Sequence, residues 1–128
     1  MKSLEWLAGL LEGEGCFTQN GGSAKAPLRY PNPTVALVMT DADVVKEANL
    51  LCEVIGERVV KIHESPLPTG KVAYSITLTG LAAVKIMVAV LPHMGIRRTV
   101  RIRQVLREWV PKKYREAVTY RQTLEGVL

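Results

Sequence analysis

The spacing of apolar residues changes along this chain, and the changes predict a succession of helices and strands. Apolar residues three or four positions apart follow Thr40 and Asp41, either of which can cap a helix, and this helical spacing ends at Gly56. A shorter helix is expected to begin after Ser3 and to run to about Glu12, before the glycines at positions 13 and 15. Three more helices are predicted further on, over residues 80–91, 96–110 and 112–126.

Alternating apolar residues predict the strands. Val35, Leu37 and Met39 share one face of residues 34–40, so this strand should bury that face. Three further strands are expected, over residues 16–20, 57–64 and 71–79. The segment 21–33 is interrupted by glycine and proline and is too broken for regular pairing throughout. The resulting order, α-β-β-α-β-β-α-α, predicts one α+β domain over residues 1–128, with four strands and helices on one side.

Composition and charge narrow the possible partners. The 128 residues suffice for one hydrophobic core, and 48% of them are apolar, which argues against disorder. The formal net charge is +5, and residues 95–115 hold eight of the 17 basic residues but only one of the 12 acidic residues, Glu108. The rest of the chain therefore has a small excess of acid. Positive charge concentrated in one segment suggests an anionic partner, with nucleic acid the first candidate.

Several other classes of protein are disfavoured. Cys16 and Cys52 lie far apart and outside any Cys/His ligand pattern, so neither a disulfide framework nor a structural zinc site is supported. The apolar start of the chain is not a signal peptide, because Glu5 interrupts it and further acids follow where a cleavage site should be. No apolar run approaches the length of a membrane span. We therefore expect a soluble intracellular protein without a membrane partner.

The first predicted helix carries two glycines that its own stability does not explain. Gly9 and Gly13 lie four residues apart and share one helix face. A glycine inside a soluble helix costs about 1 kcal/mol relative to alanine. Small residues at this spacing allow a second helix to approach closely, so a packing role is expected for this face.

The end of the same helix carries acids in an unfavourable place. Glu12 and Glu14 lie at the negative end of the helix dipole, where a carboxylate loses roughly 0.3–1 kcal/mol. A bound cation explains this placement better than folding does, and Glu14 together with the carbonyl of Gly13 offers the oxygen ligands that hard divalent cations take. The alternative is two solvated glutamates at a frayed helix end.

These residues carry a family resemblance. Residues 7–15, Leu-Ala-Gly-Leu-Leu-Glu-Gly-Glu-Gly, closely resemble the LAGLIDADG motif of homing endonucleases, with five identities in nine positions and Glu for Asp at both acidic positions. The predicted element order also resembles the αββαββα core of that family, so the resemblance covers most of the chain. It implies a four-stranded antiparallel sheet that binds DNA, with helices on the opposite face.

The resemblance also implies a metal site and a dimer. In this family the last acid of each motif binds a divalent metal beside the scissile phosphate, a role that falls on Glu14, with the Gly13 carbonyl as a further ligand. The expected cofactor is Mg²⁺, or Mn²⁺ or Ca²⁺ in its place. Glu12 would instead make a helix-end contact. Because only one motif is present, the resemblance implies a homodimer. Its expected interface comprises Leu7, Ala8, Gly9, Leu10, Glu12 and Gly13.

Two further catalytic positions follow from the resemblance. Asp41 matches a polar position that helps to hold the attacking water, although the same residue can serve as a helix N-cap. Arg97 matches a basic position near the scissile phosphate, with Arg98 as the adjacent DNA-binding candidate. Ordinary phosphate clamping is the alternative role for Arg97.

The outward face of the sheet is the implied reading surface, because an antiparallel ribbon fits the major groove of DNA. Alternation selects the outward positions Thr18, Asn20, Thr34, Lys61, His63, Lys71, Ser75 and Thr77. Lys25, Arg29 and Tyr30, in the broken segment, are expected to reach the flanks of the target. A solvated sheet face is the alternative, since polar residues at alternate strand positions are the normal pattern.

The leading functional hypothesis is a site-specific endonuclease that cuts double-stranded DNA by metal-dependent phosphodiester hydrolysis. A symmetric dimer implies a long, roughly palindromic target. The main alternative is a DNA- or RNA-binding module on the same scaffold, such as an intron-splicing maturase or a regulator, without cleavage. A weaker alternative is a basic interaction protein with a coincidental motif. A chain starting at Met1 favours an intron-borne or stand-alone gene over an intein.

Overall fold

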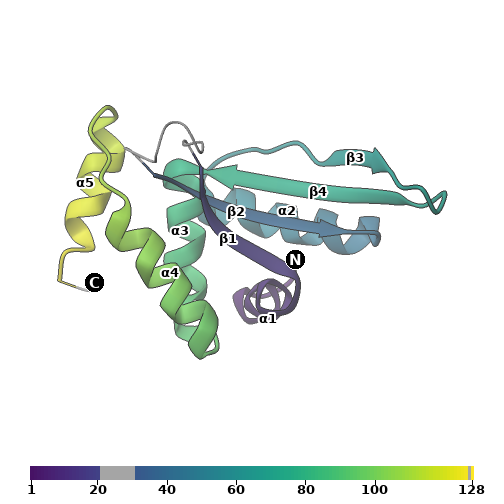
Figure 1. Cartoon of the computed structure of the whole chain (residues 1–128), viewed down its shortest axis with the longest axis horizontal. Helices are drawn as coiled ribbons and strands as arrows, with labels where there is room; N and C mark the ends of the chain where they lie inside the picture. The colour runs from purple at the N-terminus through teal and green to yellow at the C-terminus, as the bar shows by residue number, and fades with distance from the viewer. Residues whose placement is uncertain (21–30, 127) are drawn as a thin grey trace.

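The chain folds into a sheet with helices packed against one face (Figure 1). The structure is a computed structural model that describes residues 1–20, 31–126 and 128. Its helices are α1 (Leu4–Glu14), α2 (Ala42–Gly56), α3 (Gly80–Val90), α4 (Ile96–Glu108) and α5 (Arg115–Thr123), with a short 3-10 helix η1 (Leu91–His93) between α3 and α4. Its strands are β1 (Gly15–Asn20), β2 (Asn32–Met39), β3 (His63–Pro66) and β4 (Val72–Thr79).

The four strands form one antiparallel sheet in the order β1-β2-β4-β3. The central strands β2 and β4 are paired on both sides, while β1 and β3 form the edges. Over the described residues, the predicted α+β class, the element order and the placement of the helices on one face are therefore confirmed.

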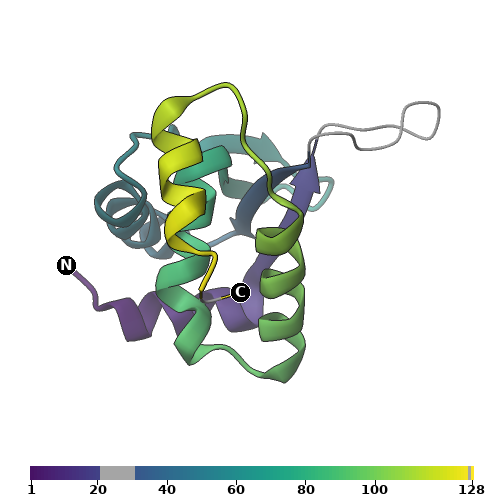
Figure 2. The same cartoon turned by 90° about the vertical axis from the view of Figure 1, so that its left-hand side faces the viewer.

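The helix-facing side of the sheet and the helices share one hydrophobic core. Val35 and Leu37 on β2 are each 1% exposed, as the alternation along this strand predicted. Helix α3 contributes six buried residues and packs against α1, α2 and the sheet. Figure 2 shows α3 enclosed between α2 and α4, with α5 in front of it. This enclosure explains why α3 carries apolar residues around most of its circumference.

Helix α1 begins as predicted but ends later. The Ser3 hydroxyl accepts a hydrogen bond from the backbone N–H of Trp6 at 3.1 Å, which makes Ser3 the N-cap. The helix continues to Glu14, two residues beyond the predicted end, and β1 begins at the next residue, Gly15. Gly15 has extended backbone angles, and its N–H donates to the carbonyl of Leu11. The motif therefore includes the helix-to-strand junction.

The predicted strand over residues 57–64 was wrong for most of its length. Helix α2 ends where Glu57 takes left-handed backbone angles, with φ 54° and ψ 41°. The chain then runs beside α2, because the Asn49 side chain donates a hydrogen bond to the carbonyl of Val60 at 3.0 Å. Only His63–Pro66 pairs with β4. The last helix is likewise shorter than the predicted span of 112–126.

Over the described ranges, no helix combines the length and the apolar character needed to cross a lipid bilayer.

Candidate functional site

The C-terminal end of α1 and the N-terminal end of α4 meet beside the edge strand β1. The Glu12 carboxylate accepts a hydrogen bond from the backbone N–H of Gly95 at 3.2 Å. Gly95 is the N-cap of α4, so an acid from α1 satisfies a free donor at the positive end of another helix. This geometry agrees with the expected helix-end contact of Glu12 and connects the motif to the basic helix.

Arg98 makes three contacts within the chain. Its Nη1 donates to the carbonyl oxygen of Gly15 at 2.6 Å, and its Nε lies 4.0 Å from the Glu12 carboxylate. Its guanidinium also lies over the ring of Phe17, 5.7 Å from the ring centre. The Arg98 side chain is only 17% exposed. The expectation that Arg98 presents its charge to DNA is therefore corrected: the guanidinium is engaged at the α1–β1 junction.

Glu14, the expected metal ligand, is exposed at the last position of α1. Within the described residues, neither an ion pair nor a hydrogen bond engages its carboxylate. Gly13 is exposed beside it. A free carboxylate at the negative end of a helix fits a divalent cation chemically.

The described residues of one chain alone do not complete such a metal site. No group of three or more His, Cys, Asp or Glu residues that could hold a metal occurs in residues 1–20, 31–126 and 128. From the motif, Glu14 and the Gly13 carbonyl can supply two oxygen ligands, or three if the carboxylate binds through both oxygens. Further ligands would have to come from water, a phosphate or a second copy of the chain.

Asp41 lies at the same end of the β1–β2 pair as Glu14. The sheet register pairs Gly15, the first residue of β1, with Leu37, near the end of β2, and Asp41 follows β2 directly. Asp41 holds the N-cap position of α2, but its side chain makes no capping hydrogen bond and is exposed. The capping alternative therefore holds for the backbone position and leaves the carboxylate free.

Arg97 lies in the first turn of α4, where the helix dipole disfavours a cation. Its side chain is exposed, and in the part of the chain that the structure describes it has neither an ion pair nor a hydrogen bond. An anionic ligand would relieve the unfavourable placement. Glu14 and Arg97 thus belong to two segments that Glu12 and Arg98 hold together.

The sheet face opposite the helices carries most of the expected reading positions. Residues directly opposite each other in an antiparallel pair share a face, so the register defines rows across the sheet. Thr18 lies in a row with Thr34 and Thr79, and His63 lies in a row with Ser75 and Val38. A third row comprises Cys16, Ala36 and Thr77. Asn20 belongs to β1, but its side chain lies outside the described residues, as do Lys25, Arg29 and Tyr30.

Three expected reading positions need correction. Thr34 lies on the predicted face but is only 4% exposed, and its hydroxyl donates to the carbonyl of Asn32 at 3.3 Å, so it is not presented to a groove. Lys61 lies in the segment that α2 holds away from β4, and Lys71 lies just before β4 begins. Both lysines are exposed and lie outside the strands, so their predicted strand positions were wrong, while their contact with DNA stays a prediction.

Sequence reasoning missed Cys16, Val38 and Thr79 on this face. Cys16 is exposed, and Val38 is 57% exposed. The alternation along each strand indicates their side of the sheet, but a criterion of polar side chains excludes Val38 and Cys16. The sequence did not indicate Thr79, because this residue is both the last residue of β4 and the N-cap position of α3.

The outward side of α1 is partly uncovered. A Cβ added to Gly9 or Gly13 would have no neighbour within 4 Å among residues 1–20, 31–126 and 128, so neither glycine is needed for packing against these parts of the chain. Leu10 is partly exposed on the same helix. Leu7 and Ala8, also expected at a dimer interface, are corrected: they are 0% and 1% exposed and belong to the core of their own chain.

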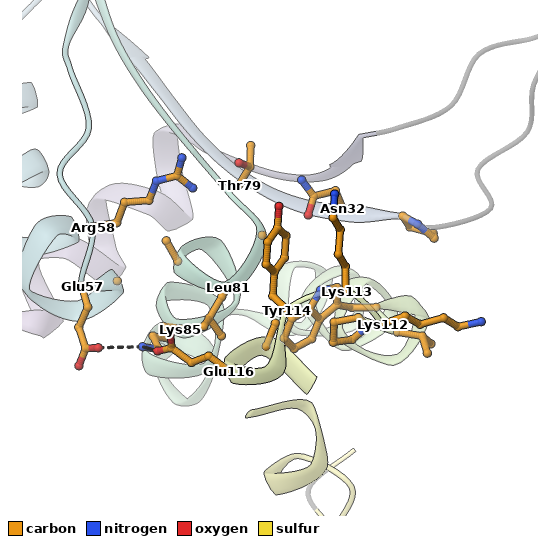
Figure 3. A pocket seen from close by; sticks show the side chains of 18 residues that line it. Asn32, Glu57, Arg58, Thr79, Leu81, Lys85, Lys112, Lys113, Tyr114 and Glu116 are labelled. Atoms are coloured by element: carbon orange, nitrogen blue, oxygen red, sulfur yellow. Dashed lines mark hydrogen bonds and ion pairs between the residues drawn. The ribbon is translucent and has the colours of Figure 1, made fainter. Parts of the chain in front are cut away.

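A separate cavity of about 780 Å³ lies at the other end of the sheet, where the start of α3, the end of α2 and the α4–α5 connection meet (Figure 3). Lys85 bonds Glu57 at 3.0 Å and lies 3.7 Å from Glu116, and the bond to Glu57 raises the pKa of Lys85. Tyr114 and Lys113 extend toward Asn32 at its mouth. Among the described residues, no predicted site residue lines this cavity, and its lining residues are too dispersed in sequence to have signalled it.

The sequence and the structure were compared with those of known proteins. No family model matches the sequence, and no curated protein sequence matches it. Solved structures do match. The homing endonuclease I-TnaI is 14% identical, with 99% of each chain covered and a TM-score of 0.55. I-CvuI, a homing endonuclease solved with a DNA target in the presence of Mg, is 12% identical over 96% of this chain and 94% of that one, with a TM-score of 0.52. I-CeuI, a group I intron-encoded homing endonuclease solved with DNA, is 13% identical over 96% of this chain and 67% of that one, with a TM-score of 0.57.

The chain therefore has the fold of the homing endonucleases. The resemblance inferred from the motif at residues 7–15 and from the element order is confirmed at the level of the fold. The motif lies on α1 and ends at the junction with β1, an edge strand of the sheet.

Proposed function

We propose that this chain is a single-motif LAGLIDADG homing endonuclease, which cuts double-stranded DNA at a specific site by metal-dependent phosphodiester hydrolysis. The observation that carries the proposal is the free, exposed Glu14 carboxylate at the end of the motif helix, in a fold shared with homing endonucleases. Two of the matching endonucleases were solved with DNA, which supports DNA as the partner of this chain.

The active form in this proposal is a homodimer built on α1. Gly9 and Gly13 leave open space along the helix among the described residues. Each glycine inside the helix destabilises it by about 1 kcal/mol relative to alanine, so a close contact elsewhere is expected to offset this cost. A second α1 across a two-fold axis would supply that contact and bring two Glu14 residues together. The dimer would thus complete the oxygen ligand set that the described part of one chain does not supply.

Each proposed catalytic residue has one task. A divalent cation, when bound, polarises the scissile phosphate and activates water for attack. Glu14 and the Gly13 carbonyl would hold that cation at the end of α1. Asp41, whose carboxylate is free of capping bonds, would accept a hydrogen bond from the attacking water and orient it. Arg97 would donate to the phosphate oxygens, where negative charge develops.

The outward sheet face would read the DNA. The rows that contain Thr18, Thr77, Ser75 and His63 carry hydrogen-bond donors and acceptors, which the antiparallel strands would present to the major groove. Because a two-fold axis would relate the two sheets, the target should be long and roughly palindromic.

Selection from a randomised DNA pool tests this function. The protein is incubated with the pool in Mg²⁺, with a parallel reaction in EDTA, and cut molecules are sequenced. The proposal predicts one enriched, roughly palindromic sequence that is cut only with the metal. A pool that is retained on the protein but never cut with Mg²⁺, Mn²⁺ or Ca²⁺ would instead identify a binding module without cleavage.

A further inference from the structure

Arg98 and Glu12 form a reciprocal pair of contacts around the two proposed catalytic residues. Glu12 lies two residues before Glu14 and binds the backbone of Gly95, two residues before Arg97. Arg98, the residue after Arg97, binds the backbone of Gly15, the residue after Glu14. Each catalytic segment thus sends one side chain to the backbone of the other.

We propose that Arg98 is a positioning residue, which with Glu12 fixes the separation and orientation of Glu14 relative to Arg97. This inference rests on the proposed function and deepens it. The two catalytic residues are far apart in sequence and lie on separate helices, so nothing in the local backbone sets their relative position. The hydrogen bonds from the Gly95 N–H to Glu12 and from Arg98 to the Gly15 carbonyl set this relative position directly.

The geometry of the pair supports a locked arrangement. Glu12 Oε2 and Arg98 Nε are both buried, and neither has a hydrogen-bond partner among the described residues. The two atoms lie 4.0 Å apart and form an ion pair. Phe17 covers the guanidinium from another side. Because Arg98 is only 17% exposed, its charge acts inside the protein and is not screened as a surface charge would be.

Gly95 leaves room for the contact. A Cβ at residue 95 would lie 2.5 Å from Glu12 Oε1, so a side chain there would displace the carboxylate from the N–H that it binds. Glycine at this N-cap therefore permits the carboxylate to reach the backbone.

Arg101 provides a matched control within the same helix. Its Nε donates to the carbonyl oxygen of Phe17 at 3.0 Å, so it also ties α4 to β1, one helical turn further along. Like Arg98, it is a half-buried arginine bonded to a strand carbonyl. Unlike Arg98, it contacts neither Glu12 nor the residue next to Glu14. Comparing the two arginines therefore separates a general tie between α4 and β1 from a specific contact with the acidic end of the motif.

The experiment compares Arg98→Met, Arg98→Lys and Arg101→Met in the full chain. Amide hydrogen exchange is measured over residues 11–17, together with the thermal midpoint and the kcat and KM for cutting the selected DNA. We expect Arg98→Met to speed exchange at Gly15 and Cys16 by about 10-fold, and Arg101→Met to leave it within about twofold. We expect Arg98→Met to lower kcat by about 100-fold at nearly unchanged KM. Arg98→Lys, which keeps one donor and the charge, should recover part of both effects.

Two results would overturn the proposal. One is equal exchange over residues 11–17 in Arg98→Met and Arg101→Met; the other is an equal loss of kcat in both at similar thermal midpoints. If the unmodified protein cuts no DNA with any divalent metal, the proposed function fails, and the exchange comparison alone decides whether Arg98 locks the junction.

Discussion

Gly15 lies so close to Leu11 that a Cβ at residue 15 would be 2.7 Å from the Leu11 carbonyl oxygen and 2.9 Å from its α-carbon. The obstructing atoms are mainly backbone, which cannot move aside without distorting α1. The last residue of the motif is therefore required to be glycine by the helix-to-strand junction, independently of any metal or DNA.

Replacing Gly15 by alanine should destabilise the fold. The added methyl group would force apart α1 and β1, at a cost of about 1–3 kcal/mol in the free energy of unfolding. Urea unfolding of Gly15→Ala measures this directly. Gly126→Ala is the control, because a Cβ at residue 126 would meet no described residue within 4 Å. Equal stability of the two variants would show that the junction yields more easily than its geometry indicates.

Replacing Gly9 by leucine should separate the proposed dimer without unfolding the chain. The space around Gly9 is open among the described residues of one chain but would be filled by the partner helix. We expect the dimer dissociation constant to rise by about 100-fold, or about 2.7 kcal/mol. Sedimentation equilibrium measures it, with Gly126→Leu as the control. A monomeric unmodified protein at micromolar concentration would contradict the proposed interface.

DNA bound to the sheet should protect Cys16 from alkylation. Cys16 is exposed in the row with Ala36 and Thr77, whereas Cys52 is 1% exposed and burial raises its pKa to about 12. At pH 8 the Cys52 thiol is protonated and enclosed, so labelling of the folded protein reports Cys16. Saturating target DNA should slow this labelling by about 10-fold or more. An unchanged rate with DNA demonstrably bound would place the DNA on another surface.

Changing one reading residue should alter the target at one position. We expect Thr77→Ala to relax the preference at a single base pair in each half-site by about 1–3 kcal/mol. The buried Thr34 serves for comparison: Thr34→Ser keeps its hydroxyl and should leave the selected sequence unaltered. Repeating the pool selection with both variants measures the change. A Thr77→Ala profile identical to that of the unmodified protein would remove Thr77 from the reading surface.

The sequence predicted the fold because local patterns and the motif agreed. Alternation along residues 34–40 and helical spacing along residues 42–56 each matched the structure, since burial of one face produces both patterns. The third strand could not be predicted in full. Its length depends on the bond from Asn49 to the Val60 carbonyl, a tertiary contact with no local signature.

The candidate site was predictable where residue chemistry alone was informative. Glu14 stood out because an acid at a helix C-terminus is electrostatically misplaced. The role of Arg98 was not predictable, because a basic residue beside Arg97 looks the same in sequence whether it faces DNA or Gly15. Leu7 and Ala8 were assigned to the wrong side of α1 for a related reason: a helix that is apolar on several faces does not reveal which face its own core takes.

The rate of Mg²⁺-dependent cutting by Glu14→Gln tests the central claim most directly. The substitution removes the charge of the proposed metal ligand at nearly constant size. Glu5→Gln, an exposed acid in the first turn of the same helix, is the matched control. We predict that Glu14→Gln cuts the selected DNA at least about 1,000-fold more slowly while still binding it, and that Glu5→Gln cuts normally. Cutting by Glu14→Gln at the unmodified rate would contradict the assignment of Glu14 as the metal ligand.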